Sequence, residues 1–162
     1  MSVTISDFGF IIGKWEGTGI AEYPTIRPVD YDEGLVFTRN DKDHVIHYEQ
    51  RPWIKSSGED NGQPVFWESG FLIDKGDGVF ELVNSQKSGR MELLRGQAKM
   101  SDGNGIELLL SSVIISNDPR TVKSGRKFRF LENVIDYELQ MATSENPGYD
   151  RHLRARLRRP GP

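Results

Sequence analysis

The chain has 162 residues, a formal net charge of −3 and no cysteine. The lack of cysteine excludes a disulfide scaffold, a thiolate nucleophile, a cysteine-ligated zinc site and an iron–sulfur cluster. The length fits one domain, residues 1–162, and the slightly acidic charge gives no overall attraction to nucleic acid or to an anionic membrane. We expect a cytoplasmic location, because residues 1–10 lack the features of a signal peptide and no apolar run approaches the ~20 residues of a membrane span.

Residues 4–12 predict a short helix that begins after Ser6. In such a helix Ile5, Phe8, Ile11 and Ile12 share one face. We expect this apolar face to plug one end of the strands that follow it.

The next segment, residues 13–26, predicts a bent first strand. Because side chains in a strand alternate between two faces, Trp15, Gly17 and Gly19 lie on the same face, with Gly13 just before them. Glycine inside a strand usually marks a bend or a close approach to the backbone. We therefore expect an inner surface emptied by two missing side chains, although the spacing alone also fits an ordinary barrel strand with a core tryptophan. Pro24 then stops regular pairing, which leaves Thr25 as the one hydroxyl at the end of the strand.

After this strand, short β-type segments alternate with turn signals along the rest of the chain. The expected strands are residues 33–38, 44–53, 65–73, 79–84, 91–100, 106–115, 122–131, 134–142 and 152–158. Most of the turns between them are short, so strands adjacent in sequence should pair in the sheet. The sequence therefore predicts an all-β fold, a single antiparallel up-and-down barrel of about ten strands, wide enough to keep a ligand cavity.

Three histidines, His44, His47 and His152, are the candidates for metal ligation. His44 and His47 are three residues apart, on opposite faces of a strand, so they cannot hold one ion together without a bulge. His152 opens the last strand, and a neutral imidazole there could ligate a metal, with its second ring nitrogen oriented by a hydrogen-bond acceptor. Strand alternation, however, places His152 on the face of Arg154 and Arg156, towards water. The histidine can face inward only if a bulge falls beside it or if the regular inward run begins after it.

The arginines near the end of the chain allow a different interpretation, a patch for nucleic acid or for a protein partner. They are Arg151, Arg154, Arg156, Arg158 and Arg159. Binders of single strands interleave such charge with exposed aromatic residues, and only Tyr149 is near. A solvated strand face explains the pattern better, because Asp and Glu outnumber Lys and Arg overall, so we expect no nucleic-acid partner.

The opening string, Gly13-x-Trp15-x-Gly17-x-Gly19 followed by Tyr23-Pro24-Thr25-Ile26, resembles the first motif of the nitrobindins, a family of small haem-binding β-barrels. The resemblance extends from about Phe8 to Arg158. Its other matches are Arg27-Pro28, Tyr48-x-Gln50, Glu68-Ser69-Gly70-Phe71-Leu72, Met141-Ala142 and His152-Leu153-x-Ala155-x-Leu157.

The resemblance implies a ten-stranded barrel that carries one haem b per chain at an open end. It implies that His152 is the axial ligand of the iron and that Thr25 contacts the haem near its edge. Arg120 stands where relatives carry a lysine that contacts the haem, and a guanidinium keeps that positive charge. Ala21 stands where relatives often have a further glycine.

The resemblance also implies a distal pocket formed by Ile26, Val65 and Phe66. Val65 and Phe66 stand where some relatives carry a Met-His pair, and Phe66 cannot donate a hydrogen bond to a ligand. The implied small-molecule partners are NO and peroxynitrite, which the ferric protein would isomerise to nitrate, and the implied assembly is a monomer or a homodimer. The barrel pattern by itself fits another function, a lipocalin-like or fatty-acid-binding carrier of a small apolar molecule without catalysis.

Overall fold

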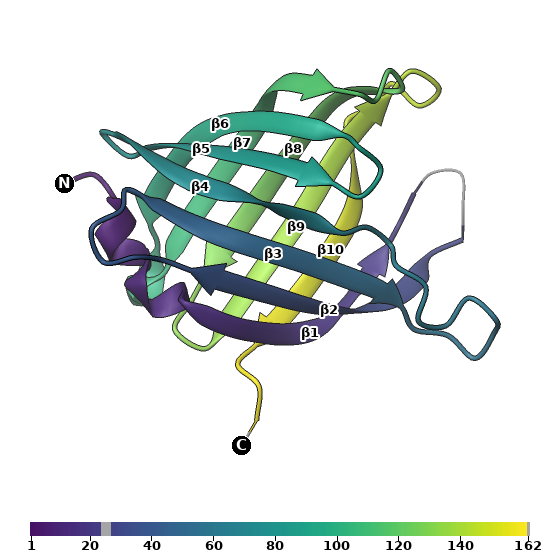
Figure 1. Ribbon diagram of the computed structural model, residues 1–162, viewed down its shortest axis with the longest axis horizontal. Helices are drawn as coiled ribbons and strands as arrows, with labels where there is room; N and C mark the ends of the chain where they lie inside the picture. Colours follow the sequence, from purple (N-terminus) through teal and green to yellow (C-terminus); the bar gives the residue numbers. More distant parts are fainter. Residues whose placement is uncertain (24–26, 162) are drawn as a thin grey trace.

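The computed structural model describes residues 1–23 and 27–161, and in that part of the chain ten antiparallel strands close into a barrel (Figure 1). The strands are β1 (Gly13–Ala21), β2 (Val29–Thr38), β3 (Val45–Ile54), β4 (Glu68–Gly76), β5 (Val79–Gln86), β6 (Met91–Met100), β7 (Ile106–Ser116), β8 (Thr121–Phe130), β9 (Val134–Thr143) and β10 (Asp150–Arg158). Each strand pairs with its neighbours in sequence, and β1 pairs with β10 to close the sheet. The predicted all-β, up-and-down barrel is therefore confirmed.

The expected strand limits agree with the structure to within two residues in the second half of the barrel and less closely in the first. β2 begins at Val29 rather than at residue 33, and β4 begins at Glu68 rather than at residue 65. In the described part of the chain β1 ends at Ala21, before Pro24, where regular pairing was expected to stop. Pro24, Thr25 and Ile26, on which several expectations rest, lie outside the described residues.

A 3₁₀ helix, η1 (Ile5–Ile11), plugs one end of the barrel, as expected, although it is tighter than an α-helix. Thr4 and Asp7 form a reciprocal capping box at its start. The ring of Phe8 packs edge-on against Phe80, at 5.2 Å, and Phe130, at 5.5 Å. Ile12 lies just beyond the helix, is partly buried and packs against the core.

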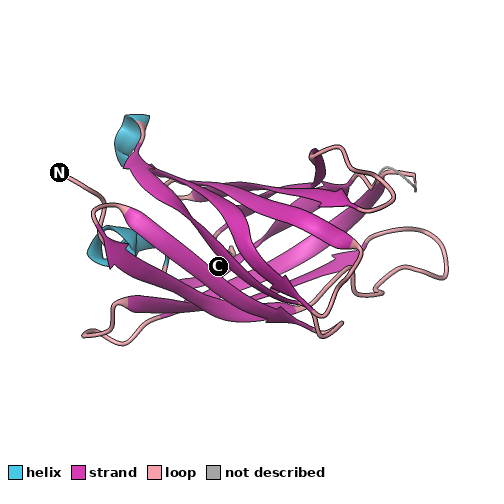
Figure 2. Ribbon diagram, turned by 90° about the horizontal axis from the view of Figure 1, so that it is seen from above, coloured by secondary structure: helices cyan, strands magenta, loops and turns pink. Residues whose placement is uncertain are grey.

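The two ends of the barrel differ. Figure 2 shows η1 and the short 3₁₀ helix η2 (Asp102–Asn104) at one end, whereas the longest loops extend from the opposite end. The interior changes character between the ends. Near η1 it is filled by large apolar side chains such as Trp15, Phe80 and Phe130, all fully buried. Towards the loop end the inward positions carry polar side chains instead, namely Glu33, Gln50, Glu68, Asn84, Glu92, Ser124 and Arg126.

The glycines of β1 accommodate protein atoms, so the expectation of an emptied inner surface is wrong. A Cβ atom on Gly19 would overlap the ring of Tyr31, and one on Gly17 would overlap the carbonyl oxygen of Arg156 and lie 2.8 Å from the Cα of Leu157. The close approach that these glycines permit is therefore that of β10 and of the core. Trp15 is a core residue, with its indole nitrogen donating to the carbonyl oxygen of Ile11 at 2.8 Å.

We expect Gly17→Ala to lower the free energy of unfolding by about 2 kcal/mol, because the new methyl group would push β1 away from the backbone of β10. Urea unfolding of the purified variant measures this loss. Gly34→Ala is the matched control, since Gly34 pairs with Glu16 in the same sheet and its Cβ would meet nothing closer than 4.0 Å. An equal loss in both variants would show that the crowding at β10 does not determine the effect.

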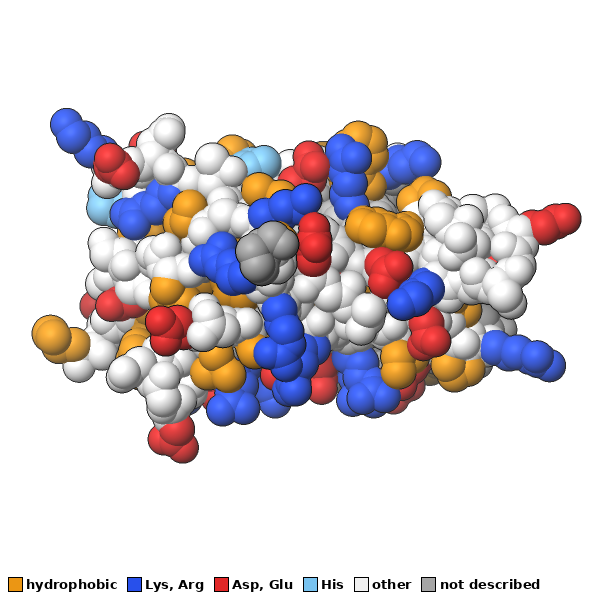
Figure 3. Space-filling model, turned by 90° about the horizontal axis from the view of Figure 1, so that it is seen from below, with side chains coloured by type: hydrophobic (Ala, Val, Ile, Leu, Met, Phe, Trp, Pro, Cys, Tyr) orange, Lys and Arg blue, Asp and Glu red, His pale blue; other side chains and the backbone are white. Residues whose placement is uncertain are grey.

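Three of the arginines near the end of the chain, Arg151, Arg154 and Arg156, pair with carboxylates on the outside of the barrel, whereas Arg159 donates to the carbonyl oxygens of Ile12 and Phe10. Arg151 pairs with Glu22 at 3.0 Å and with Glu138 at 3.5 Å, and Arg156 pairs with Asp136 at 2.7 Å. Figure 3 shows a face on which basic and acidic side chains are mixed, with apolar ones between them. These contacts are those of a solvated strand face. No helix in the described residues is long and apolar enough to cross a membrane.

Candidate functional site

His152 faces the interior because of a bulge in β10. On the β9 side the pairing runs from Arg151 opposite Gln140 directly to Leu153 opposite Leu139, so His152 has no partner in the ladder. The extra residue turns both His152 and Leu153 inward, with exposed fractions of 3% and 0%. Of the two solutions that strand alternation allowed, the structure has the bulge.

The imidazole of His152 is buried without a hydrogen bond. Neither Nδ1 nor Nε2 has a partner among residues 1–23 and 27–161, so the expected acceptor for the second nitrogen is not found there. The ring of Tyr23 packs edge-on against it, with ring centroids 5.1 Å apart. Burial lowers the pKa of His152, the cation of Arg90 lowers it further, and Asp150 opposes them. The ring is thus held neutral, with a free lone pair, which is the form that binds a metal.

His152 lines a cavity of about 730 Å³ at the loop end of the barrel. The turns between the strand pairs β3–β4, β5–β6, β7–β8 and β9–β10 contribute to its wall. The volume lies within the range of about 300–1,000 Å³ typical of cofactor and ligand pockets. A second hollow of about 700 Å³ lies across β1, β2, β8, β9 and β10, but its described lining contains no histidine.

Three of the other expected site residues also line the cavity at the loop end. Val65 and Phe66 lie in its wall, in the segment before β4, and are partly packed against the core. Arg120 lies at its rim, with a side chain that is 82% exposed and 3.9 Å from Asp118. Thr25 and Ile26 are not among the described residues.

The other two histidines lie outside this cavity. His44 is exposed just before β3, and His47 Nε2 lies 2.9 Å from Ser69 Oγ. No group of three or more possible metal ligands forms elsewhere in the described part of the chain.

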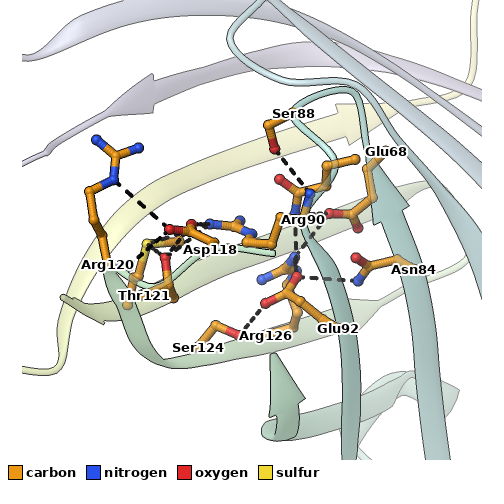
Figure 4. Close-up of polar contacts among 12 residues, drawn as sticks. Glu68, Asn84, Ser88, Arg90, Glu92, Asp118, Arg120, Thr121, Ser124 and Arg126 are labelled. Carbon is orange, nitrogen blue, oxygen red and sulfur yellow. Dashed lines mark hydrogen bonds and ion pairs between the residues drawn. The ribbon is translucent and has the colours of Figure 1, made fainter. Parts of the chain in front are cut away.

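A polar cluster that the sequence analysis missed borders the cavity (Figure 4). Arg90 Nη1 donates to Asp118 Oδ2 and to Thr121 Oγ1, each at 3.3 Å, and Thr121 Oγ1 donates to the same Asp118 oxygen at 2.7 Å. Burial opposes ionisation of Asp118, but the bonds from Thr121, the amide of Arg120 and Arg90 together hold its pKa below the usual range. All three residues line the cavity.

A second cluster lies deeper, where Arg126 bridges two glutamates. Arg126 Nη2 donates to Glu68 Oε1 at 3.0 Å and to Glu92 Oε1 at 2.9 Å, and all three side chains are at most 2% exposed. Tyr48 and Gln86 also donate to Glu68, and Asn84, Gln86 and Ser124 donate to Glu92. Burial alone would raise the pKa of Glu92, but Arg126 and then Arg90 hold it below its usual value.

The alternation of side chains along each strand could have revealed this second cluster from the sequence. Glu68 precedes the buried Leu72 by four residues, Glu92 precedes Leu94 by two, and Arg126 precedes Phe128 by two. Each polar side chain must then point inward with its apolar neighbour. The ion pair between Arg90 and Asp118, by contrast, connects two turns that are distant in the sequence, so no local pattern predicts it.

The family model for a THAP4-like, heme-binding beta-barrel domain matches residues 4–159. The chain belongs to this family. The resemblance drawn from the opening motif is thereby confirmed, and the family indicates haem as the cofactor.

Relatives of this heme-binding barrel family match along almost the whole chain. A peroxynitrite isomerase from Arabidopsis thaliana is 30% identical over 153 residues, covering 94% of this chain and 87% of that protein. A peroxynitrite isomerase from Mycobacterium ulcerans is 33% identical over 153 residues, covering 92% of this chain and 90% of that protein. The crystal structure of Rv2717c from M. tuberculosis superposes with a TM-score of 0.84 at 28% identity, and 97% of each chain is covered.

The described residues fit a haem of this barrel family. The cavity contains a neutral imidazole with two unpartnered nitrogens, and an unpaired buried polar group is costly unless something binds it. The apolar side chains of Val65, Phe66 and Leu153 can pack against the faces of a flat ring. Three cations of the cavity lining, Lys87, Arg90 and Arg120, suit the carboxylates of such a group, against two acids, Asp118 and Glu145.

Proposed function

We propose that this chain binds one haem b in the cavity at the loop end, with His152 as the axial ligand. We further propose that the loaded protein binds NO and, in the ferric state, isomerises peroxynitrite to nitrate. The observation that carries the proposal is the buried imidazole of His152, aimed into the cavity with neither nitrogen bonded to a described residue. The family model and the relatives named peroxynitrite isomerase support it.

The residues of the chain would hold the cofactor and shape its surroundings. His152 supplies one nitrogen lone pair, and burial keeps that nitrogen unprotonated. Val65 and Phe66 offer no hydrogen-bond donor and exclude water from part of the cavity, which favours uncharged diatomic ligands such as NO. Arg120 would meet a carboxylate at the rim, and Thr25 would contact the edge of the ring. When bound, haem supplies the iron that takes NO and at which peroxynitrite isomerises.

Hemin titration of the purified protein tests the proposal. We expect the wild type to develop a Soret band with one hemin per chain, and His152→Ala to bind hemin at least about tenfold more weakly, because the axial nitrogen is lost. His47→Ala is the matched control, since His47 contacts Ser69 outside the cavity. A wild type without a Soret band, or a His152→Ala spectrum equal to that of the wild type, would rule out the proposed site.

A carrier of a small apolar molecule is the second candidate, since the cavity combines an apolar wall with a buried arginine that could meet a carboxylate. Native mass spectrometry after gentle purification separates the two functions. A retained fatty acid together with indifference to hemin would favour the carrier, whereas a mass increase of one haem favours the proposal above.

A further inference from the structure

Arg90 lies in the turn between β5 and β6, immediately before β6, beside the cavity that His152 lines. Its side chain is 12% exposed and lines the cavity wall. The positive charge of Arg90 lowers the pKa of His152, in addition to the larger effect of burial. A cation buried this deeply is costly unless charged or polar groups face it on every side.

Among residues 1–23 and 27–161, the hydrogen bonds of this guanidinium are made on one side. Nη1 donates to Asp118 and Thr121 and lies 3.9 Å from the sulfur of Met141. Nε is buried and has no partner among residues 1–23 and 27–161, and within the same residues no hydrogen bond is formed by Nη2. The free pair, Nε and Nη2, is an edge of the guanidinium that can bind a carboxylate or a planar oxyanion through two parallel hydrogen bonds.

The nearby carboxylates do not fully compensate the positive charge of Arg90. Asp118 is shared between Arg90, at 3.3 Å, and Arg120, at 3.9 Å, so two cations have one counter-ion (Figure 4). Glu92 lies deeper and takes its hydrogen bonds from Asn84, Gln86, Ser124 and Arg126, without one from Arg90. The lining contains one further acid, Glu145, and one further cation, Lys87.

We propose that Arg90 is the anion-binding residue of the cavity, and that its Nε–Nη2 edge takes a carboxylate or a planar oxyanion. This inference rests on the proposed function in treating the cavity as a ligand site. The anion has two possible sources with the same chemistry, a carboxylate carried by the porphyrin edge or a free oxyanion such as nitrate. Arg120, which is exposed at the rim, then has the smaller share in holding the anion.

Three titrations of the wild type and of Arg90→Gln test the inference. Hemin carries two carboxylates and hemin dimethyl ester carries none, so their dissociation constants, read from the Soret band, isolate the carboxylate. The third measurement is the Tm of the haem-free protein in sodium nitrate, compared with sodium fluoride at equal ionic strength. Arg95→Gln is the matched control, because Arg95 lies on the outside of β6, five residues after Arg90, and pairs with Glu81 at 2.6 Å.

If the porphyrin supplies the anion, Arg90→Gln weakens hemin binding by about 10- to 100-fold and leaves the dimethyl ester unchanged. If a free oxyanion is bound, nitrate raises the Tm of the wild type and not that of Arg90→Gln, while hemin binding is kept. Equal behaviour of Arg90→Gln and the wild type in all three titrations overturns the inference.

Two further results are separable from these. A wild type that never binds hemin contradicts the proposed function, and the nitrate titration alone then decides the role of Arg90. If Arg90→Gln does not fold, Arg90→Lys replaces it, because lysine keeps the charge but cannot present a two-pronged edge. Wild-type values for Arg90→Lys in every titration would then overturn the inference.

Discussion

Replacing Arg126 with methionine is expected to lower the free energy of unfolding by about 4 kcal/mol. The substitution leaves Glu68 and Glu92 without the cation that bridges them at 3.0 and 2.9 Å, in side chains that are at most 1% exposed. Breaking a buried ion pair in this way costs more than the pair contributes, because the partner that remains is an uncompensated charge away from water. Urea unfolding near neutral pH measures the loss, provided that the slope of the transition is unchanged.

Two comparisons identify the cause. Arg95→Met breaks the pair with Glu81 on the outside of the barrel, where Arg95 is 51% exposed, and the loss there should stay below about 1 kcal/mol. In the background of Arg126→Met, the changes Glu68→Gln and Glu92→Gln should restore part of the stability, because they remove the unpaired charges. An equal loss for Arg126→Met and Arg95→Met, or no recovery with the two glutamines, would contradict the interpretation.

The architecture could be predicted from the sequence because its signals are local. Turn residues such as Asp102-Gly103-Asn104-Gly105 stand between runs that alternate in polarity, and short turns force neighbouring strands to pair. The start of β2 was placed too late because it depends on pairing with β1, and the start of β4 was placed too early because its ladder with β3 begins only at Glu68. Val29, for example, begins β2 by pairing with Ala21 of β1.

The candidate site was only partly predictable, for two physical reasons. Strand alternation placed His152 towards water, and only a bulge could turn it inward. A bulge depends on how β10 pairs with β9, so it cannot be predicted from the sequence of β10 alone. The polar layer beneath the cavity was missed because acidic residues such as Glu33 and Glu68 are usually solvent-exposed, whereas here each shares the inward face with core residues. The alternation of side chains that identified the core residues could also have identified these buried acids.

The role of the glycines shows the limit of a motif. Gly17 and Gly19 were correctly placed on the face of Trp15, yet the atoms that approach them belong to β10 and Tyr31. A glycine pattern predicts that something comes close, and only the fold tells what it is.

Glu33 should make the barrel less stable at alkaline pH. We expect the free energy of unfolding of the wild type, relative to that of Glu33→Gln, to fall by about 4 kcal/mol between about pH 5 and pH 8. Burial, the main cause, raises the pKa of Glu33 from 4.5 to about 8, the hydrogen bonds from Tyr137 and Gln50 oppose this, and the charge of Glu68 adds to it. The unfolded chain therefore releases this proton near pH 4.5, whereas the folded barrel keeps it until about pH 8. The stabilisation is complete below the lower value and is lost as the pH rises to the higher one.

Glutamine at position 33 isolates this titration. Its carbonyl oxygen can accept the bonds that Glu33 Oε1 takes from Gln50 and Tyr137, both at 2.7 Å, and it carries no proton that can be lost. Urea midpoints for both proteins across the pH range give the difference directly. Glu107→Gln, at an exposed position on β7, is the control and should follow the wild type at every pH. Parallel curves for the wild type and Glu33→Gln would mean that water or a rearranged partner stabilises the ionised carboxylate inside the barrel.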